Sequence, residues 1–137
     1  MKKLFVIVLA AVLGLVSCKK DSVAPVITFT EVGHENTHVA MRGDDMHLEA
    51  NIVAEGLIKS IQVELHKGSF EIEKEYTSGK YIGVKNTEFH EHIDIPSDAP
   101  LGEYHLHFTV TDNNGQQTMA EAHVEIIEYD PSKIDEE

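Results

Sequence analysis

The alternation of apolar and polar residues is clearest between residues 103 and 127, where it predicts two β-strands joined by a turn. Successive side chains of a strand point to opposite faces, so a period of two indicates a strand that is buried on one side. The residues predicted to point inward are Tyr104, Leu106, Phe108 and Val110 in the first strand and Thr118, Ala120, Ala122, Val124 and Ile126 in the second. The opposite face of this hairpin is polar and carries histidines.

The turn of the hairpin is predicted over residues 112–115, which read Asp-Asn-Asn-Gly and favour tight turns and left-handed backbone. Both strands bury one face, so directly opposed residues must both be even-numbered or both be odd-numbered. A three-residue loop over residues 113–115 meets this condition and places Gly115 at the left-handed position. In the resulting register His105 lies opposite His123 on the outer face.

Shorter segments with the same periodicity predict further strands earlier in the chain. They cover residues 26–32, 44–54, 61–66, 70–76 and 89–95, and residues 33–43 are predicted to form a loop. About seven short strands with regular turn signals and no helical period predict an all-β fold, a single immunoglobulin-like antiparallel β-sandwich. The sandwich is expected to occupy residues 25–128, and the acidic segment 129–137 is expected to be disordered.

Four segments of the predicted strands carry a resemblance to a known family. They read Asp45-Met46-His47-Leu48-Glu49-Ala50, Ile61-Gln62-Val63-Glu64-Leu65-His66, Phe89-His90-Glu91-His92-Ile93-Asp94-Ile95-Pro96 and Tyr104-His105-Leu106-His107-Phe108. Together they resemble a Bacteroidota lipoprotein family of unknown function, domain of unknown function 4625. The resemblance covers nearly all of the domain and implies the sandwich fold and a lipid anchor, but it implies no biochemical activity.

The first 17 residues have the pattern of a secretory signal peptide. Two lysines precede an apolar run over residues 4–16, which is shorter than the roughly 20 residues that a membrane span needs. The run ends in Leu15-Val16-Ser17-Cys18, which resembles the lipobox of bacterial lipoproteins. By that resemblance Cys18 is lipidated, residues 18–24 are a tether, and the protein is an outer-membrane lipoprotein facing the periplasm or the cell surface. The alternative is a plain signal peptide with an incidental cysteine.

The charge of the chain argues against several classes of partner. The formal net charge is −13, and loss of the two signal-peptide lysines leaves nine basic residues against 24 acidic ones, or −15. A surface this acidic argues against nucleic acid and anionic lipid as partners, because phosphates would be repelled. The partners that remain as expectations are the membrane, through the lipid anchor that the resemblance implies, a metal ion and a surface protein complex. With a single cysteine, neither an intramolecular disulfide nor a cysteine metal site is expected.

Nine histidines are present, and seven of them fall on predicted outward faces of strands. Neutral imidazole is a common ligand of zinc, copper and nickel, and no other cofactor is indicated. Strand order by analogy with immunoglobulin-like domains separates these histidines into two groups on different sheets. The first candidate metal site comprises His66, His105, His107 and His123, and the second comprises His47, His90 and His92 with Asp94.

The sequence leaves other functions open. Outward positions of a sheet must be polar, so the histidines can also be simple surface residues, and the protein can be a non-catalytic structural or interaction module accessory to a surface receptor or glycan system. A surface that responds to pH through many histidines is a third reading. No nucleophile elbow, phosphate-binding glycine loop or dinucleotide fingerprint is present, and the protein is not expected to be an enzyme.

Overall fold

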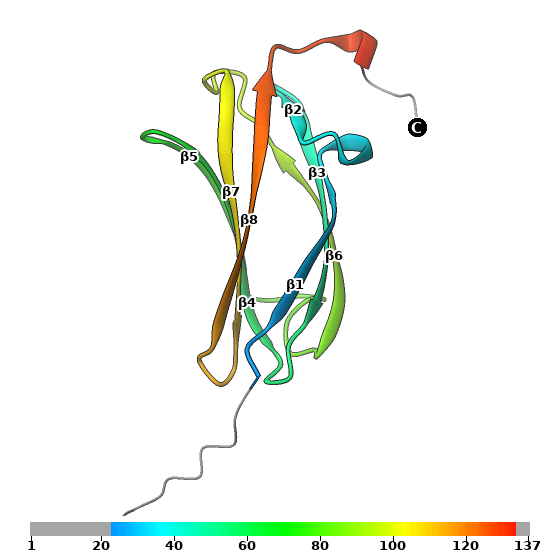
Figure 1. The fold of residues 1–137 in the computed structure, drawn as a ribbon, viewed down its shortest axis with the longest axis vertical. Coiled ribbons are helices and arrows are strands. Elements are labelled where there is room, and N and C mark those ends of the chain that lie inside the picture. The colour runs from blue at the N-terminus through cyan, green and yellow to red at the C-terminus, as the bar shows by residue number, and fades with distance from the viewer. Residues whose placement is uncertain (1–22, 134–137) are drawn as a thin grey trace, which may run out of the picture.

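Eight strands in two facing sheets make up residues 23–133, the part of the chain that the computed structural model describes (Figure 1). The predicted signal peptide, Cys18 and the tether up to residue 22 lie outside the described residues. The strands are β1 (Val26–Val32), β2 (Val39–Met41), β3 (Asp45–Val53), β4 (Ile58–Lys67), β5 (Phe70–Tyr76), β6 (Asn86–Asp94), β7 (Gly102–Asp112) and β8 (Gln117–Ile127).

The two sheets contain three and five strands. The three-stranded sheet has the order β1-β3-β6, and the five-stranded sheet has the order β2-β8-β7-β4-β5. All neighbouring strands are antiparallel except β2, which runs parallel to β8. The predicted immunoglobulin-like antiparallel sandwich is thereby confirmed, with eight strands in place of about seven.

The additional strand lies in the segment that was predicted to be a loop, residues 33–43. This prediction was wrong, since the segment contains the short 3-10 helix η1 (His34–Asn36) and β2. A strand of three residues is too short to show an alternating pattern, and it is held by backbone bonds that any sequence can make. Glu125 N–H donates to the carbonyl of His38 at 2.9 Å, and Arg42 N–H donates to the carbonyl of Ile127 at 3.0 Å.

The inner faces of the two sheets form one hydrophobic core. The largest fully buried side chains are Tyr104, Phe89, Phe108, Met46, Leu48, Ile52, Ile58, Ile61, Leu65, Ile93, Leu106 and Ile126. Phe89 of one sheet meets Phe108 of the other edge to face, with ring centroids 5.0 Å apart. Burial of each such side chain contributes about 1.5–3 kcal/mol, so packing across the sandwich holds the two outer faces in fixed positions.

Tyr104 makes a contact that is characteristic of immunoglobulin-like sandwiches. Its side chain is fully buried near the start of β7, and its hydroxyl donates to the carbonyl of Pro100 at 2.7 Å. This is the tyrosine corner found where the chain crosses into the penultimate strand. Burial raises the pKa of the Tyr104 phenol.

The β7–β8 hairpin has the predicted three-residue loop. Asp112 N–H donates to the carbonyl of Gln116 at 2.9 Å, and Gly115 has a φ of 80°. The Asp112 side chain closes the turn, because its Oδ1 accepts hydrogen bonds from the backbone N–H groups of Asn114 and Gln116, each at 2.9 Å. The predicted register, with His105 opposite His123, is therefore confirmed.

Beyond β8, the described part of the predicted disordered tail contains a second 3-10 helix, η2 (Pro131–Lys133). Ser132 donates two hydrogen bonds to Asp130 Oδ1, and these bonds lower the pKa of the Asp130 carboxyl. Residues 134–137 lie outside the description. Among residues 23–133, no helix has the length and apolar character needed to cross a membrane.

Candidate metal centre

The seven strand histidines lie on the outer faces of the sandwich, as predicted, because their neighbours along each strand are the residues that fill the core. The predicted division between the sheets is also confirmed. The three-stranded sheet carries His47 on β3 with His90 and His92 on β6, and the five-stranded sheet carries His66 on β4, His105 and His107 on β7 and His123 on β8.

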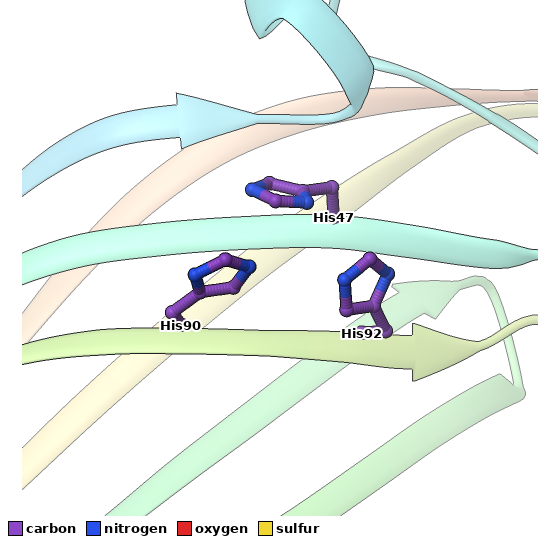
Figure 2. A group of neighbouring side chains, drawn as sticks. All are labelled: His47, His90 and His92. Carbon is purple, nitrogen blue, oxygen red and sulfur yellow. The ribbon is translucent and has the colours of Figure 1, made fainter. Parts of the chain in front are cut away.

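The histidines of the three-stranded sheet converge on one point. His47 lies directly opposite His92 in the β3–β6 register, and His90 is two residues away from His92 on the same face. The ring centroid of His47 lies 4.5 Å from that of His90 and 4.9 Å from that of His92. One ring nitrogen from each residue falls within 4.8 Å of the others, and Figure 2 shows the His90 and His92 rings turned toward β3. We call these three residues the histidine cluster.

Carboxylates contact the rings of the histidine cluster from its edges. His92 Nδ1 lies 3.0 Å from Asp45 Oδ1, and His90 Nδ1 lies 3.0 Å from Glu49 Oε1. A carboxylate at Nδ1 keeps the proton of the neutral ring on that nitrogen and leaves the lone pair on Nε2. The contacts therefore fix the orientation and tautomer of both rings in the way that metal-binding histidines require.

His47 is the most enclosed member of the histidine cluster. Its side chain is 15% exposed, against 51% for His90 and 49% for His92. His47 Nε2 is buried without a hydrogen-bond partner, and it lies 3.5 Å from Glu31 Oε2 and 3.5 Å from Glu49 Oε1, beyond the usual 2.7–3.2 Å of an N–H···O bond. A buried imidazole nitrogen without a partner is costly, and a bound metal ion would supply the missing partner.

A cavity of about 620 Å³ adjoins the histidine cluster. It is lined by two of the cluster residues, His47 and His92, together with His34, Glu35, Thr37, Val39, Ala40, Met41, Asp44, Asp45, Ile127 and Lys133. Three of these residues are acidic, and one is a lysine. The cavity therefore lies beside His47 and His92, and acidic residues outnumber basic ones in its lining, which favours cations.

The histidines of the five-stranded sheet form the predicted row. His66 pairs with His105 across β4–β7, and His105 pairs with His123 across β7–β8. The ring centroids of His66 and His105 are 5.3 Å apart, and those of His105 and His123 are 4.8 Å apart. The row is therefore present as a chain of ring contacts across three strands.

The ligand atoms of the five-stranded sheet converge beside this row. Glu64, His66 and His107 each place one ligand atom within 4.8 Å of the other two. We call these residues the mixed triad. Two residues of the first predicted site, His66 and His107, thus place their ligand atoms together with that of Glu64. The other two, His105 and His123, lie outside this triad and are linked to it by ring contacts.

Asp94, predicted to complete the second site, lies directly opposite Asp45 at the end of the β3–β6 pairing and outside the histidine cluster. It is Asp45 that contacts His92. Sequence reasoning also missed Glu31 and Glu49, which form an overlapping group with His47. Glu49 could have been found because it follows His47 by two residues on the same face, but Glu31 requires the β1–β3 register.

The fold and the outer-face histidines define an immunoglobulin-like β-sandwich with clustered potential metal ligands. Residues 16–127 match the family described as domain of unknown function DUF4625, and the chain belongs to this family. The resemblance of the strand segments to domain of unknown function 4625 is thereby confirmed. No curated protein matches the chain.

Three solved structures with similar folds are bacterial proteins. OgpA from Akkermansia muciniphila is 14% identical with a TM-score of 0.53, over 74% of this chain and 28% of OgpA. The sporulation control protein Spo0M from Bacillus subtilis is 14% identical with a TM-score of 0.51, over 80% of this chain and 51% of Spo0M. A DUF4466 family protein from Parabacteroides merdae is 12% identical with a TM-score of 0.53, over 75% of this chain and 45% of that protein. The chain spans about half or less of each, and these likenesses show the fold alone.

Proposed function

We propose that this protein is a non-catalytic, membrane-anchored lipoprotein that binds a divalent transition metal ion at the histidine cluster. The observation that carries the proposal is the convergence of His47, His90 and His92, with one ring nitrogen of each within 4.8 Å of the others. Imidazole nitrogens suit zinc, copper(II) and nickel, and these are the ions proposed.

The geometry requires only small side-chain movements to close around an ion. Zn–N bonds of about 2.0–2.1 Å place the nitrogens of a tetrahedral site roughly 3.3 Å apart. Ring nitrogens that already lie within 4.8 Å on opposed strands can reach this separation by rotation about the side-chain bonds. Three imidazoles leave a fourth position for Glu49, Glu31 or a solvent molecule.

Charge also favours a cation at the histidine cluster. Asp45, Glu49 and Glu31 lie against its rings in four histidine–carboxylate pairs. A divalent ion among neutral imidazoles would be balanced by these carboxylates, which at the same time hold the rings in position.

The cellular location is part of the proposal and rests on sequence alone. The basic start, the apolar run and the Leu15-Val16-Ser17-Cys18 segment resemble a bacterial lipoprotein signal, and Cys18 would carry the lipid. We place the domain at the outer membrane, facing the periplasm or the cell surface. β1 begins a few residues after the proposed anchor, and the histidine cluster lies near the other end of this strand, because Val32 pairs with Leu48 whereas Val26 pairs with Val53. The metal site would therefore lie at the end of the sandwich away from the anchor.

Calorimetric titration of the purified protein with zinc, copper(II) or nickel tests the proposal. The double variant His90→Ala/His92→Ala should lose one bound ion, and a matched control, His123→Ala, should retain every ion of the unsubstituted protein. His123 is an outward histidine that belongs to none of the convergent groups among the described residues. If the double variant binds as many ions as the unsubstituted protein with equal affinity, the metal function of the cluster is disproved, and a structural or interaction module becomes the better account.

A further inference from the structure

The five-stranded sheet carries a second set of convergent ligands on the opposite side of the sandwich from the histidine cluster. Glu64 and His107 lie directly opposite each other on β4 and β7, and His66 follows Glu64 by two residues on the same face. All three side chains are half-buried, with one ligand atom of each within 4.8 Å of the others. The His66 and His107 ring centroids are 4.9 Å apart at an interplanar angle of 68°.

Neighbouring residues restrain the mixed triad and make its surroundings acidic. The His105 ring stacks on His66 at an interplanar angle of 27°, which limits rotation of the His66 ring. Glu121, opposite His107 on β8, places its Oε1 3.4 Å from His107 Nε2. Glu71 and Glu73 on β5 lie opposite His66 and Glu64. Carboxylates on both sides of the mixed triad favour a cation between them.

The donor set differs from that of the histidine cluster. Two imidazoles and one carboxylate are the ligands of many zinc sites and of the facial triads that hold iron(II), and both kinds of site leave coordination positions open to water. The set combines the harder oxygen donor with borderline nitrogen donors, which suits first-row divalent ions of the zinc, cobalt(II) and iron(II) type.

We propose that the mixed triad of Glu64, His66 and His107 is a second, independent site for such a divalent ion. The two sites lie on different sheets with the core between them, so an ion at one shares no ligand with an ion at the other. This second site does not depend on the function proposed for the histidine cluster. The protein with both sites filled would bind two ions, one on each outer face.

Equilibrium dialysis with zinc tests the second site, using the double variant His90→Ala/His92→Ala as the background. This background should retain one zinc ion. Adding Glu64→Gln or His107→Ala should weaken the remaining binding by more than about 100-fold, beyond the 10- to 100-fold effect expected for an outer-shell residue. Adding His123→Ala, the matched control on the same sheet, should leave it unchanged. Circular dichroism verifies that each variant is folded. Because two different residues of the mixed triad are substituted, the test still stands if one of the variants does not fold.

Three results would overturn the second site. The background variant could bind no zinc, the Glu64→Gln and His107→Ala variants could bind zinc as tightly as the background, or His123→Ala could weaken binding as much as they do. Failure of the function proposed above would give a different result. The unsubstituted protein and the background variant would then each bind one zinc ion, and adding Glu64→Gln to the background would remove that ion.

Discussion

His47 on β3 and His92 on β6 lie directly opposite each other, with ring centroids 4.9 Å apart, although 44 residues separate them in the sequence. The contact exists because both side chains leave the same outer face of two paired strands, whose hydrogen bonds hold neighbouring backbones about 4.7–4.9 Å apart. His90 adds a third imidazole from the same strand as His92. The metal function that we propose depends on this cross-strand pairing.

Asp45 and Asp94 lie opposite each other, but only Asp45 contacts a ring of the histidine cluster. Substituting each aspartate in turn therefore tests whether that contact affects metal binding. Asp45→Asn should weaken metal binding by about 10–100-fold, because Asp45 orients His92, while the number of bound ions stays the same. Asp94→Asn is the matched control and should have no effect. Competition with a chromogenic chelator measures both affinities. Equal affinities for the two variants would show that Asp45 does not act on the site.

Metal binding should weaken in acid because protons compete for the imidazole nitrogens. An ordinary imidazole takes up a proton near pH 6.5, and a ligand must be neutral to bind. Zinc affinity should therefore fall at least about tenfold between pH 7.5 and pH 5.5. Carboxylates remain ionised over this range, so an affinity that does not change would mean that the ion is held by carboxylates instead of histidines.

The tyrosine corner should contribute measurably to stability. Tyr104→Phe removes the hydrogen bond to Pro100 and leaves that carbonyl without its partner, which should lower the free energy of unfolding by about 1–2 kcal/mol. Tyr129→Phe, at a residue that is 51% exposed, should change it by less than about 0.5 kcal/mol. Urea denaturation measures both values. Tyr104 would have no such role if the two variants were equally stable.

Cys18→Ser tests the proposed anchor separately from the domain. The variant should lose its lipid and leave the membrane fraction of the native host, and it should still fold because β1 begins at Val26. Fractionation and mass spectrometry of the N-terminus are the measurements. A mature protein with an unmodified Cys18 would rule out the lipoprotein interpretation.

The sequence predicted the register of the β7–β8 hairpin to the residue. Alternation fixes which side chains share a face, and a short turn allows few registers, so the pairing of His105 with His123 follows from counting. The connections between β3 and β6 are long and include two other strands. Alternation shows that His47 and His92 point outward from β3 and β6, but it does not show which residues of the two strands lie opposite each other. That register is set by packing of the core.

The same limit explains why the carboxylates that contact the histidine cluster were missed. Alternation places Asp45 on the same face as His47 and Asp94 on the same face as His90 and His92, and only the register shows which aspartate contacts His92. Glu31 comes from β1, whose pairing with β3 includes a shift between Phe29 and Glu31 that alternation cannot reveal. The pattern therefore identified the two groups of histidines, whereas the carboxylates around them required the structure.

A crystal structure of the protein with bound zinc tests the central claim most directly. Anomalous scattering at the zinc edge should show an ion between β3 and β6, bound by ring nitrogens of His47, His90 and His92 at about 2.0–2.1 Å. Zinc-loaded crystals without an anomalous peak at the histidine cluster would contradict the proposed function.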